Sequence, residues 1–325
     1  LVSSPMRRVP DTLGFSVPRG ADSRRTKAPM VALIQSVAPI YGWGLAALGT
    51  LRGGRWGPAG RAFYLAAART VPLVAILFIP IAMSVEQIYP WAFSRGGAEF
   101  HFSPGKAAYL EPTFFRGRAV AYFVVWLLVG WGLGRVSRLD LPPGETYAMR
   151  RAGALSLVLL VPTTTFAAFD WGMSLEPTWY SSIYGAILTA CGVLAVHALT
   201  IRSLAHVAPT NGQPDADAFN DLGNLQLAFL MVTTYFSFSQ FLIIWSANLP
   251  SEISWYQRRL SDGWQWMGLF IALAGFVAPF LMLLGRDLKR TPRQLVKVAV
   301  LLLAMYSVHI YWIIVPAFTD TGLAW

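Results

Sequence analysis

Residues 153–173 read GALSLVLLVPTTTFAAFDWGM and contain one charged side chain, that of Asp170. A helix needs about 20 apolar residues to cross the hydrocarbon core of a bilayer, which is about 30 Å thick. This stretch is long enough, it is too long for a strand, and its polar and apolar residues do not alternate. Because lipid offers no partners to backbone N–H and C=O groups, the stretch is predicted to be a transmembrane helix.

Seven other segments have the same character. They span approximately residues 31–51, 71–90, 118–135, 181–204, 223–247, 264–285 and 295–316. Turn-forming residues separate several of them, as in LPPG at 141–144. The sequence therefore predicts an all-α integral membrane protein, an antiparallel bundle of about eight transmembrane helices.

The composition agrees with this class. Of the 325 residues, 55% are hydrophobic and only 13% are charged, whereas a soluble domain carries about 25% charged residues. Disordered, disulfide-rich and ordinary cytosolic proteins are thereby excluded. The single cysteine, Cys191, rules out an intrachain disulfide, and it also rules out an iron–sulfur cluster or CxxC zinc site made by this chain alone.

Charge divides the chain into a tail and a membrane domain. Residues 1–28 hold six Lys and Arg with little apolar periodicity and are expected to be a flexible basic tail, while residues 29–325 are expected to form a single transmembrane helical domain. The formal net charge is +10. Since the basic residues of the membrane domain lie in short loops, they indicate contact with anionic lipid, and no nucleic acid partner is expected.

The loops also predict an orientation. Four of them, counted with the basic residues that flank them, carry fourteen Lys and Arg, against six on the opposite side, and are expected to face the cytoplasm by the positive-inside rule. The four are loops 52–70, 136–152, 205–222 and 286–294. The six basic residues of the tail, on the other side, oppose this orientation.

Asp170 is the sharpest candidate for chemistry, because an ionisable residue within a membrane is costly and marks a functional hypothesis. Thr163 and Ser174 lie seven residues before it and four after it, so the three are expected to share one helix face. A carboxyl beside hydroxyls and waters could form a proton half-channel. The alternative is a carboxylate neutralised by an arginine, or one at the interface that caps the helix end.

Other titratable groups extend the list of proton-path candidates. Glu86 lies near the end of the second apolar segment, His197 in the fifth and His309 in the eighth. Glu86 is also compatible with contact to interfacial water, and each histidine with a hydrogen bond to a neighbouring helix. The two histidines would suffice to ligate one haem, but nothing else in the sequence selects a haem site.

The sixth segment carries a polar stripe, Thr233, Ser237 and Gln240. Such stripes usually form hydrogen bonds between helices, and the sharper alternative is the lining of a quinone or proton path. The aromatic residues that follow are expected to form an interfacial belt. They are Trp245, Trp255, Tyr256, Trp264 and Trp266.

Five stretches resemble the NrfD/polysulfide-reductase family, and most closely the F-type membrane subunit of alternative complex III, a quinol:cytochrome c oxidoreductase. They are TTTFAAFDWGMSLEPTWYSSIYG at 163–185, YPWA at 89–92, KAAYL at 106–110 followed by Phe114 and Phe115, FSQFLIIWSANLP at 238–250, and YWIIVP at 311–316. The resemblance covers roughly residues 45–316.

The resemblance implies a membrane subunit that carries no metal or other cofactor of its own and packs in a larger complex. The partners implied are an iron–sulfur/molybdopterin-like subunit, a multihaem cytochrome and a second NrfD-like subunit. A quinone is a candidate ligand. Asp170 falls in the matching motif and would transfer protons. The family usually has ten helices, so the first and last would be missing here, and an adjoining subunit would become more necessary.

Two functions outside this family remain open at the sequence level. An autonomous secondary transporter would show inverted repeats and broken helices, and neither is evident. A structural membrane anchor without a titratable role would tolerate replacement of both Asp170 and His309.

Overall fold

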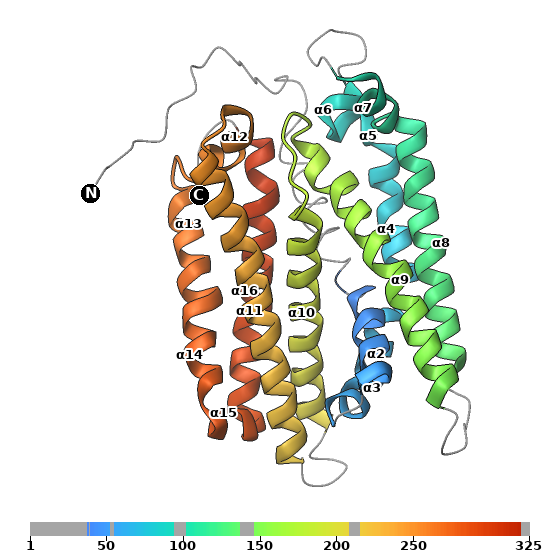
Figure 1. Cartoon of the computed structure of the whole chain (residues 1–325), viewed down its shortest axis with the longest axis vertical. Helices are drawn as coiled ribbons and strands as arrows, with labels where there is room; N and C mark the ends of the chain where they lie inside the picture. Colours follow the sequence, from blue (N-terminus) through green and yellow to red (C-terminus); the bar gives the residue numbers. More distant parts are fainter. Residues whose placement is uncertain are drawn as a thin grey trace.

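The computed structural model describes residues 38, 40–52, 55–93, 102–136, 146–207 and 215–319, so the predicted tail at 1–28 lies outside the described residues. Seven helical spans in this part of the chain are long and apolar enough to cross a membrane. They run alternately up and down as one bundle (Figure 1). The chain is therefore a multi-pass membrane protein.

Three of these spans are single α-helices: α8 (Pro112–Val136), α10 (Tyr184–Val207) and α11 (Ala216–Ala247). Two others are an α-helix followed by a short turn: α9 (Thr146–Trp171) with the 3-10 turn Met173–Leu175, and α16 (Pro292–Ile314) with the turn Val315–Phe318. The remaining two are built of successive helices: α3 (Trp56–Ala68) with α4 (Val71–Met83), and α13 (Trp264–Phe270) with the π-helix Ile271–Val277 and α14 (Ala278–Leu284).

An eighth apolar helix, α2 (Ile40–Arg52), is shorter and packs against α3 and α9. Short helices lie at the ends of the spans: α5 (Val85–Ile88), α6 (Pro90–Phe93), α7 (Pro104–Tyr109), α12 (Pro250–Arg259) and α15 (Arg286–Arg290). No strand occurs among the described residues. The predicted all-α bundle of about eight helices is confirmed.

The boundaries of the second span differ from the prediction. The sequence predicted a loop at 52–70 and a helix at 71–90, but residues 56–68 form α3 and the span ends at Met83. The helix breaks at Arg69 and Thr70 because Pro72 has no N–H and its ring crowds the carbonyl four residues earlier. Arg69, expected in a loop, therefore lies within a span.

Another proline widens a helix. Pro279 stands two residues after the π-helix Ile271–Val277. A proline ring clashes with the carbonyl four residues before it, here that of Gly275, and a π-turn gives that carbonyl room.

The two ends of the bundle differ. Described parts of the four basic segments lie at one end of the bundle, the basic end (Figure 1), where Asp217 at the start of α11 pairs with Arg55 before α3 and with Arg290 of α15. The other end, which we call the capped end, carries α5, α6, α7, α12 and the connection 172–183 (Figure 1). Placement of the basic end in the cytoplasm stays a prediction.

Small residues let helices approach closely. A Cβ atom added to Gly130 of α8 would lie 2.2 Å from Cζ2 of Trp43 on α2, whereas one added to Gly132 would meet no atom within 4 Å. Trp43 is buried. The contact between α2 and α8 therefore requires glycine at position 130.

We predict that Gly130→Ala lowers the thermal unfolding midpoint in detergent, because overpacking costs about 1–3 kcal/mol. Gly132→Ala is the matched control and should leave the midpoint unchanged or raise it slightly, since alanine favours helix. Equal midpoints for the two variants would contradict this packing.

Candidate functional site at the capped end

The sequence stretches that resemble the NrfD family lie far apart along the chain but are hydrogen-bonded to one another at the capped end. The hydroxyl of Tyr89 donates to the carbonyl of Trp171 at 3.2 Å. Nζ of Lys106 donates to the carbonyl of Pro177 at 2.5 Å. The indole N–H of Trp179 donates to the carbonyl of Glu252 on α12 at 2.9 Å. The capped end is thus one polar network and the candidate functional site.

Asp170, near the end of α9, is clamped by Arg118 of α8. Nε and Nη2 of Arg118 donate to Oδ2 and Oδ1 of Asp170, both at 2.9 Å. The Asp170 side chain is 1% exposed and that of Arg118 is 12% exposed. A bidentate pair of this kind has fixed geometry and a strong charge-assisted bond. The carboxylate therefore has its charge balanced within the protein.

Neighbouring aromatic groups complete the clamp. The hydroxyl of Tyr122 donates to Oδ2 of Asp170 at 2.8 Å. The guanidinium of Arg118 donates to the carbonyl of Tyr109 at 2.7 Å and lies 3.8 Å from the centre of the Tyr109 ring and 4.5 Å from that of Phe114. Burial and the Asp170 charge raise the pKa of Tyr109, so this phenol stays protonated.

Thr163 and Asp170 both contact α8, whereas the hydroxyls of Thr163 and Ser174 make their bonds elsewhere than at the Asp170 carboxylate. Thr163 donates to the carbonyl of Leu159 and accepts from the indole N–H of Trp126. Ser174 lies in the 3-10 turn after α9, and its hydroxyl donates to the backbone carbonyl of Asp170. Neither hydroxyl bonds to the carboxylate, because each satisfies a backbone carbonyl near it. The arginine-neutralised alternative describes the observed geometry.

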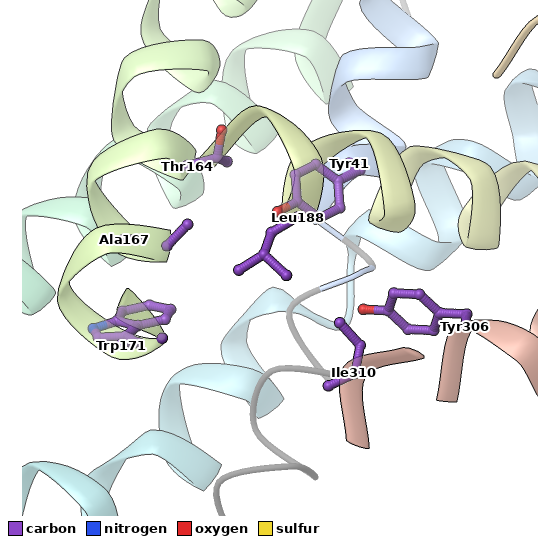
Figure 2. Close-up of a pocket in the computed structure, with 9 residues that line it drawn as sticks. Tyr41, Thr164, Ala167, Trp171, Leu188, Tyr306 and Ile310 are labelled. Carbon is purple, nitrogen blue, oxygen red and sulfur yellow. The ribbon is translucent and has the colours of Figure 1, made fainter. Parts of the chain in front are cut away.

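A small cavity lies between α2, α9, α10 and α16. It is lined by Tyr41, Thr164, Trp171, Tyr306 and Ile310, among others, and has a volume of about 20 Å³ (Figure 2). That is room for about one water and far below the roughly 300 Å³ of small-molecule pockets. Asp170 does not line it. The cavity suits neither a quinone headgroup nor a file of waters to that carboxylate.

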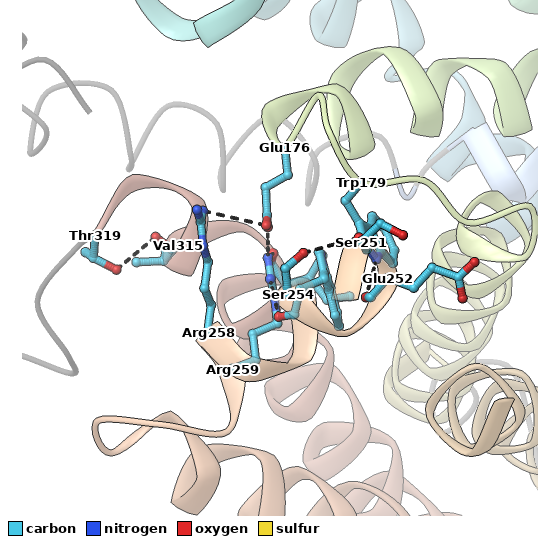
Figure 3. Close-up of polar contacts among 11 residues, drawn as sticks. Glu176, Trp179, Ser251, Glu252, Ser254, Arg258, Arg259, Val315 and Thr319 are labelled. Carbon is cyan, nitrogen blue, oxygen red and sulfur yellow. Dashed lines mark hydrogen bonds and ion pairs between the residues drawn. The ribbon is translucent and has the colours of Figure 1, made fainter. Parts of the chain in front are cut away.

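A second buried ion pair ties the connection 172–183 to α12. Nη2 of Arg259 lies 2.7 Å from Oε1 of Glu176 and also donates to the carbonyl of Ile313, while Arg258 approaches Glu176 at 3.7 Å (Figure 3). Arg259 is 1% exposed and its guanidinium stacks 3.7 Å above the Trp255 ring. The pKa of Arg259 is lowered, because burial disfavours its charge by more than the nearby Glu176 charge favours it.

Of the polar stripe on α11, only Gln240 bonds to another element. Its amide accepts from Ser181 at 2.9 Å and donates to the hydroxyl of Tyr256 at 3.4 Å. Burial raises the pKa of Tyr256 to about 12. Thr233 bonds to its own helix, and the Ser237 hydroxyl has no hydrogen-bond partner among the residues that the structure describes. Gln240 thus joins the capped end, as interhelical bonding predicts, whereas no bond links the three residues into a path.

The aromatic belt was predicted only in part. Trp245 and Trp266 are exposed, but Trp255, Tyr256 and Trp264 are buried. Trp255 stacks on Trp179 with ring centres 5.0 Å apart. These buried rings pack the capped end together and do not face the membrane interface.

The remaining titratable candidates lie apart from Asp170. Glu86 is half-exposed and accepts from Nη2 of Arg116 at 2.6 and 2.8 Å. His197 bonds through Nδ1 to the hydroxyl of Tyr64 and through Nε2 to the carbonyl of Leu222. Because both ring nitrogens are engaged, His197 ties three helices together and offers none to a haem iron.

His309 has a different neighbour. Its Nδ1 lies 3.5 Å from Sγ of Cys191, which joins α16 to α10. Among the residues that the structure describes, no three His, Cys, Asp or Glu side chains gather as metal ligands would.

Comparison with protein-family models gives no match, and comparison with curated protein sequences gives none either.

The sequence did not identify the basic partners of the two buried carboxylates. Arg118 and Tyr122 are one turn apart on α8, and this spacing places them on one helix face. The spacing was the feature of the sequence from which a joint role in binding one carboxylate could have been inferred. Glu176 and Arg259 are 83 residues apart, and sequence spacing carries no information about such a pair.

We predict that Arg118→Gln and Asp170→Asn each lower the free energy of unfolding by about 3–5 kcal/mol, because each leaves an uncompensated buried charge or breaks its network. The double variant should lose less than the sum of the two, as measured by a double-mutant cycle in detergent.

The control is the exposed pair Glu86 and Arg116, for which Arg116→Gln should cost about 1 kcal/mol or less. Additive effects at Asp170 and Arg118, or losses no larger than the control, would contradict the clamp.

Proposed function

We propose that this chain is a membrane subunit of a quinol-oxidising respiratory complex of the NrfD type in a bacterial inner membrane. In this proposal it serves as a helical scaffold whose capped end docks redox subunits. The observation that carries it is spatial: stretches that resemble the family at 89–92, 106–110, 163–185 and 238–250 are joined there by direct hydrogen bonds.

The rigidity of the capped end supports a docking role. Its two buried carboxylates are each held by an arginine, and aromatic rings fill the space between its segments. Exposed rings remain at its surface, with Phe93 62% and Tyr180 63% exposed. A fixed backbone that carries exposed aromatic side chains favours binding of another protein, because these rings add contact area and lose little conformational entropy on binding.

The sides of the bundle leave room for neighbouring membrane subunits. In the span Trp264–Leu284, only 11% of the most apolar 18-residue stretch is buried against the rest of the chain. This face is available to lipid or to a second NrfD-like subunit. Electrons would pass through an iron–sulfur/molybdopterin-like subunit and a multihaem cytochrome.

In this proposal Asp170 is a structural anion. Proton transfer through it requires that the carboxylate exchange protons with water, whereas both of its oxygens are engaged by the bidentate bond to Arg118. The proton half-channel inferred from the sequence is therefore the less favoured account of this residue.

Co-purification tests the assignment. The tagged full chain, extracted from its native membrane in mild detergent, should carry stoichiometric haem-containing and iron–sulfur subunits, and the preparation should reduce its haem on addition of a quinol. A chain that purifies alone, with transport activity after reconstitution, would contradict the proposal and support the transporter.

We predict that Asp170→Asn reduces the amount of assembled complex, while turnover and proton uptake per assembled complex stay at wild-type values. Glu86→Gln, which breaks an exposed pair, is the control and should change neither quantity. Wild-type amounts of complex with lowered turnover or proton uptake would instead assign proton transfer to Asp170.

A further inference from the structure

A groove of about 620 Å³ opens on the membrane side of the bundle near its basic end. Its wall on one side is the junction of α3 and α4, with Leu65, Arg69 and Val71. Its other wall is the last two turns of α8, with Trp131 and Arg135. The groove shares no lining residue with the capped end, and none of the functions above uses it.

Two arginines, Arg69 and Arg135, line this groove. Neither guanidinium has an ion pair or hydrogen bond with a residue that the structure describes. Arg135 lies 5.6 Å from the centre of the Trp131 ring. Three other basic residues at this end have partners, since Arg55 and Arg290 pair with Asp217 and Lys289 donates to Asn224.

Trp43 forms part of the groove lining and is 6% exposed. The amino-terminal end of α4 also begins here, at Val71, and a helix N-terminus carries partial positive charge.

The remaining surface of the groove is apolar. Leu65, Pro72 and Leu127 line it, and exposed leucine and isoleucine side chains of α4 continue it, among them Leu73 and Ile76. A ligand that fits must combine an anionic head with hydrocarbon chains. Basic pockets between transmembrane helices near the cytoplasmic side bind anionic lipid headgroups in this way.

We propose that this groove is a binding site for an anionic phospholipid, with the phosphate between Arg69 and Arg135 and the acyl chains along α4 and α8. Arg69 directly follows the last residue of α3 and lines the groove together with Val71 and Pro72 at the start of α4. The proposal does not depend on the respiratory assignment.

Lipid binding to the delipidated full chain in detergent tests the proposal, with phosphatidylglycerol, phosphatidylcholine and inorganic phosphate as the three probes. Native mass spectrometry should show phosphatidylglycerol retained and the other two not. The double variant Arg69→Gln/Arg135→Gln should weaken phosphatidylglycerol binding about 30-fold, which corresponds to about 2 kcal/mol for two basic side chains.

Two further variants separate the groove from general charge. Arg150→Gln/Arg151→Gln removes two exposed arginines at the same end outside the groove and should leave the affinity unchanged. Gly134→Leu keeps every charge but fills the groove, because Gly134 lines it and a Cβ there meets no atom within 4 Å; it should abolish retention. Equal losses in both arginine variants, equal binding of phosphatidylcholine, or equal binding of inorganic phosphate would overturn the proposal.

Discussion

The bidentate ion pair between Arg118 and Asp170 joins α8 to α9 near the capped end of the bundle. Removing two charges from water is costly, and the pair persists because its bond is bidentate and further hydrogen bonds stabilise each partner. The hydroxyl of Tyr122 donates to Asp170, and the carbonyl of Tyr109 accepts from Arg118. Once α8 and α9 are fixed in this register, Trp171 lies where Tyr89 can donate to its carbonyl, and the first segment of the cap is held.

The same principle accounts for the contrast between the two ends of the molecule. At the capped end the buried charges of Asp170 and Glu176 are balanced by arginines within the chain. At the basic end Arg69 and Arg135 have no acidic partner among the described residues, and the lipid surface supplies the complementary charge. One end is therefore organised internally, while the other depends on its surroundings.

Hydropathy predicted the fold because lipid leaves an apolar segment no structure other than a helix. The prediction failed at α3, where Arg61 and several glycines lower the mean hydropathy of residues 52–70 although the segment is helical. It also treated Trp255 and Trp264 as interfacial, since their burial depends on contacts with distant segments such as Trp179 and Tyr311.

The candidate site was predictable to a lesser degree. Asp170 is identifiable from sequence as the single charge in its apolar stretch. Its partner is not, because hydropathy does not determine which helices are neighbours or at what depth Arg118 lies. The cost of an unpaired charge predicts that some partner exists, and only the three-dimensional arrangement identifies it.

The most direct test of this account is the protonation state of Asp170 in the working protein. Infrared difference spectroscopy of the assembled complex, with Asp170→Asn as the reference, resolves the C=O stretch of a protonated carboxyl. The account predicts no such band assignable to Asp170, at rest or during turnover. A band that appears during turnover and is absent in the variant would contradict it.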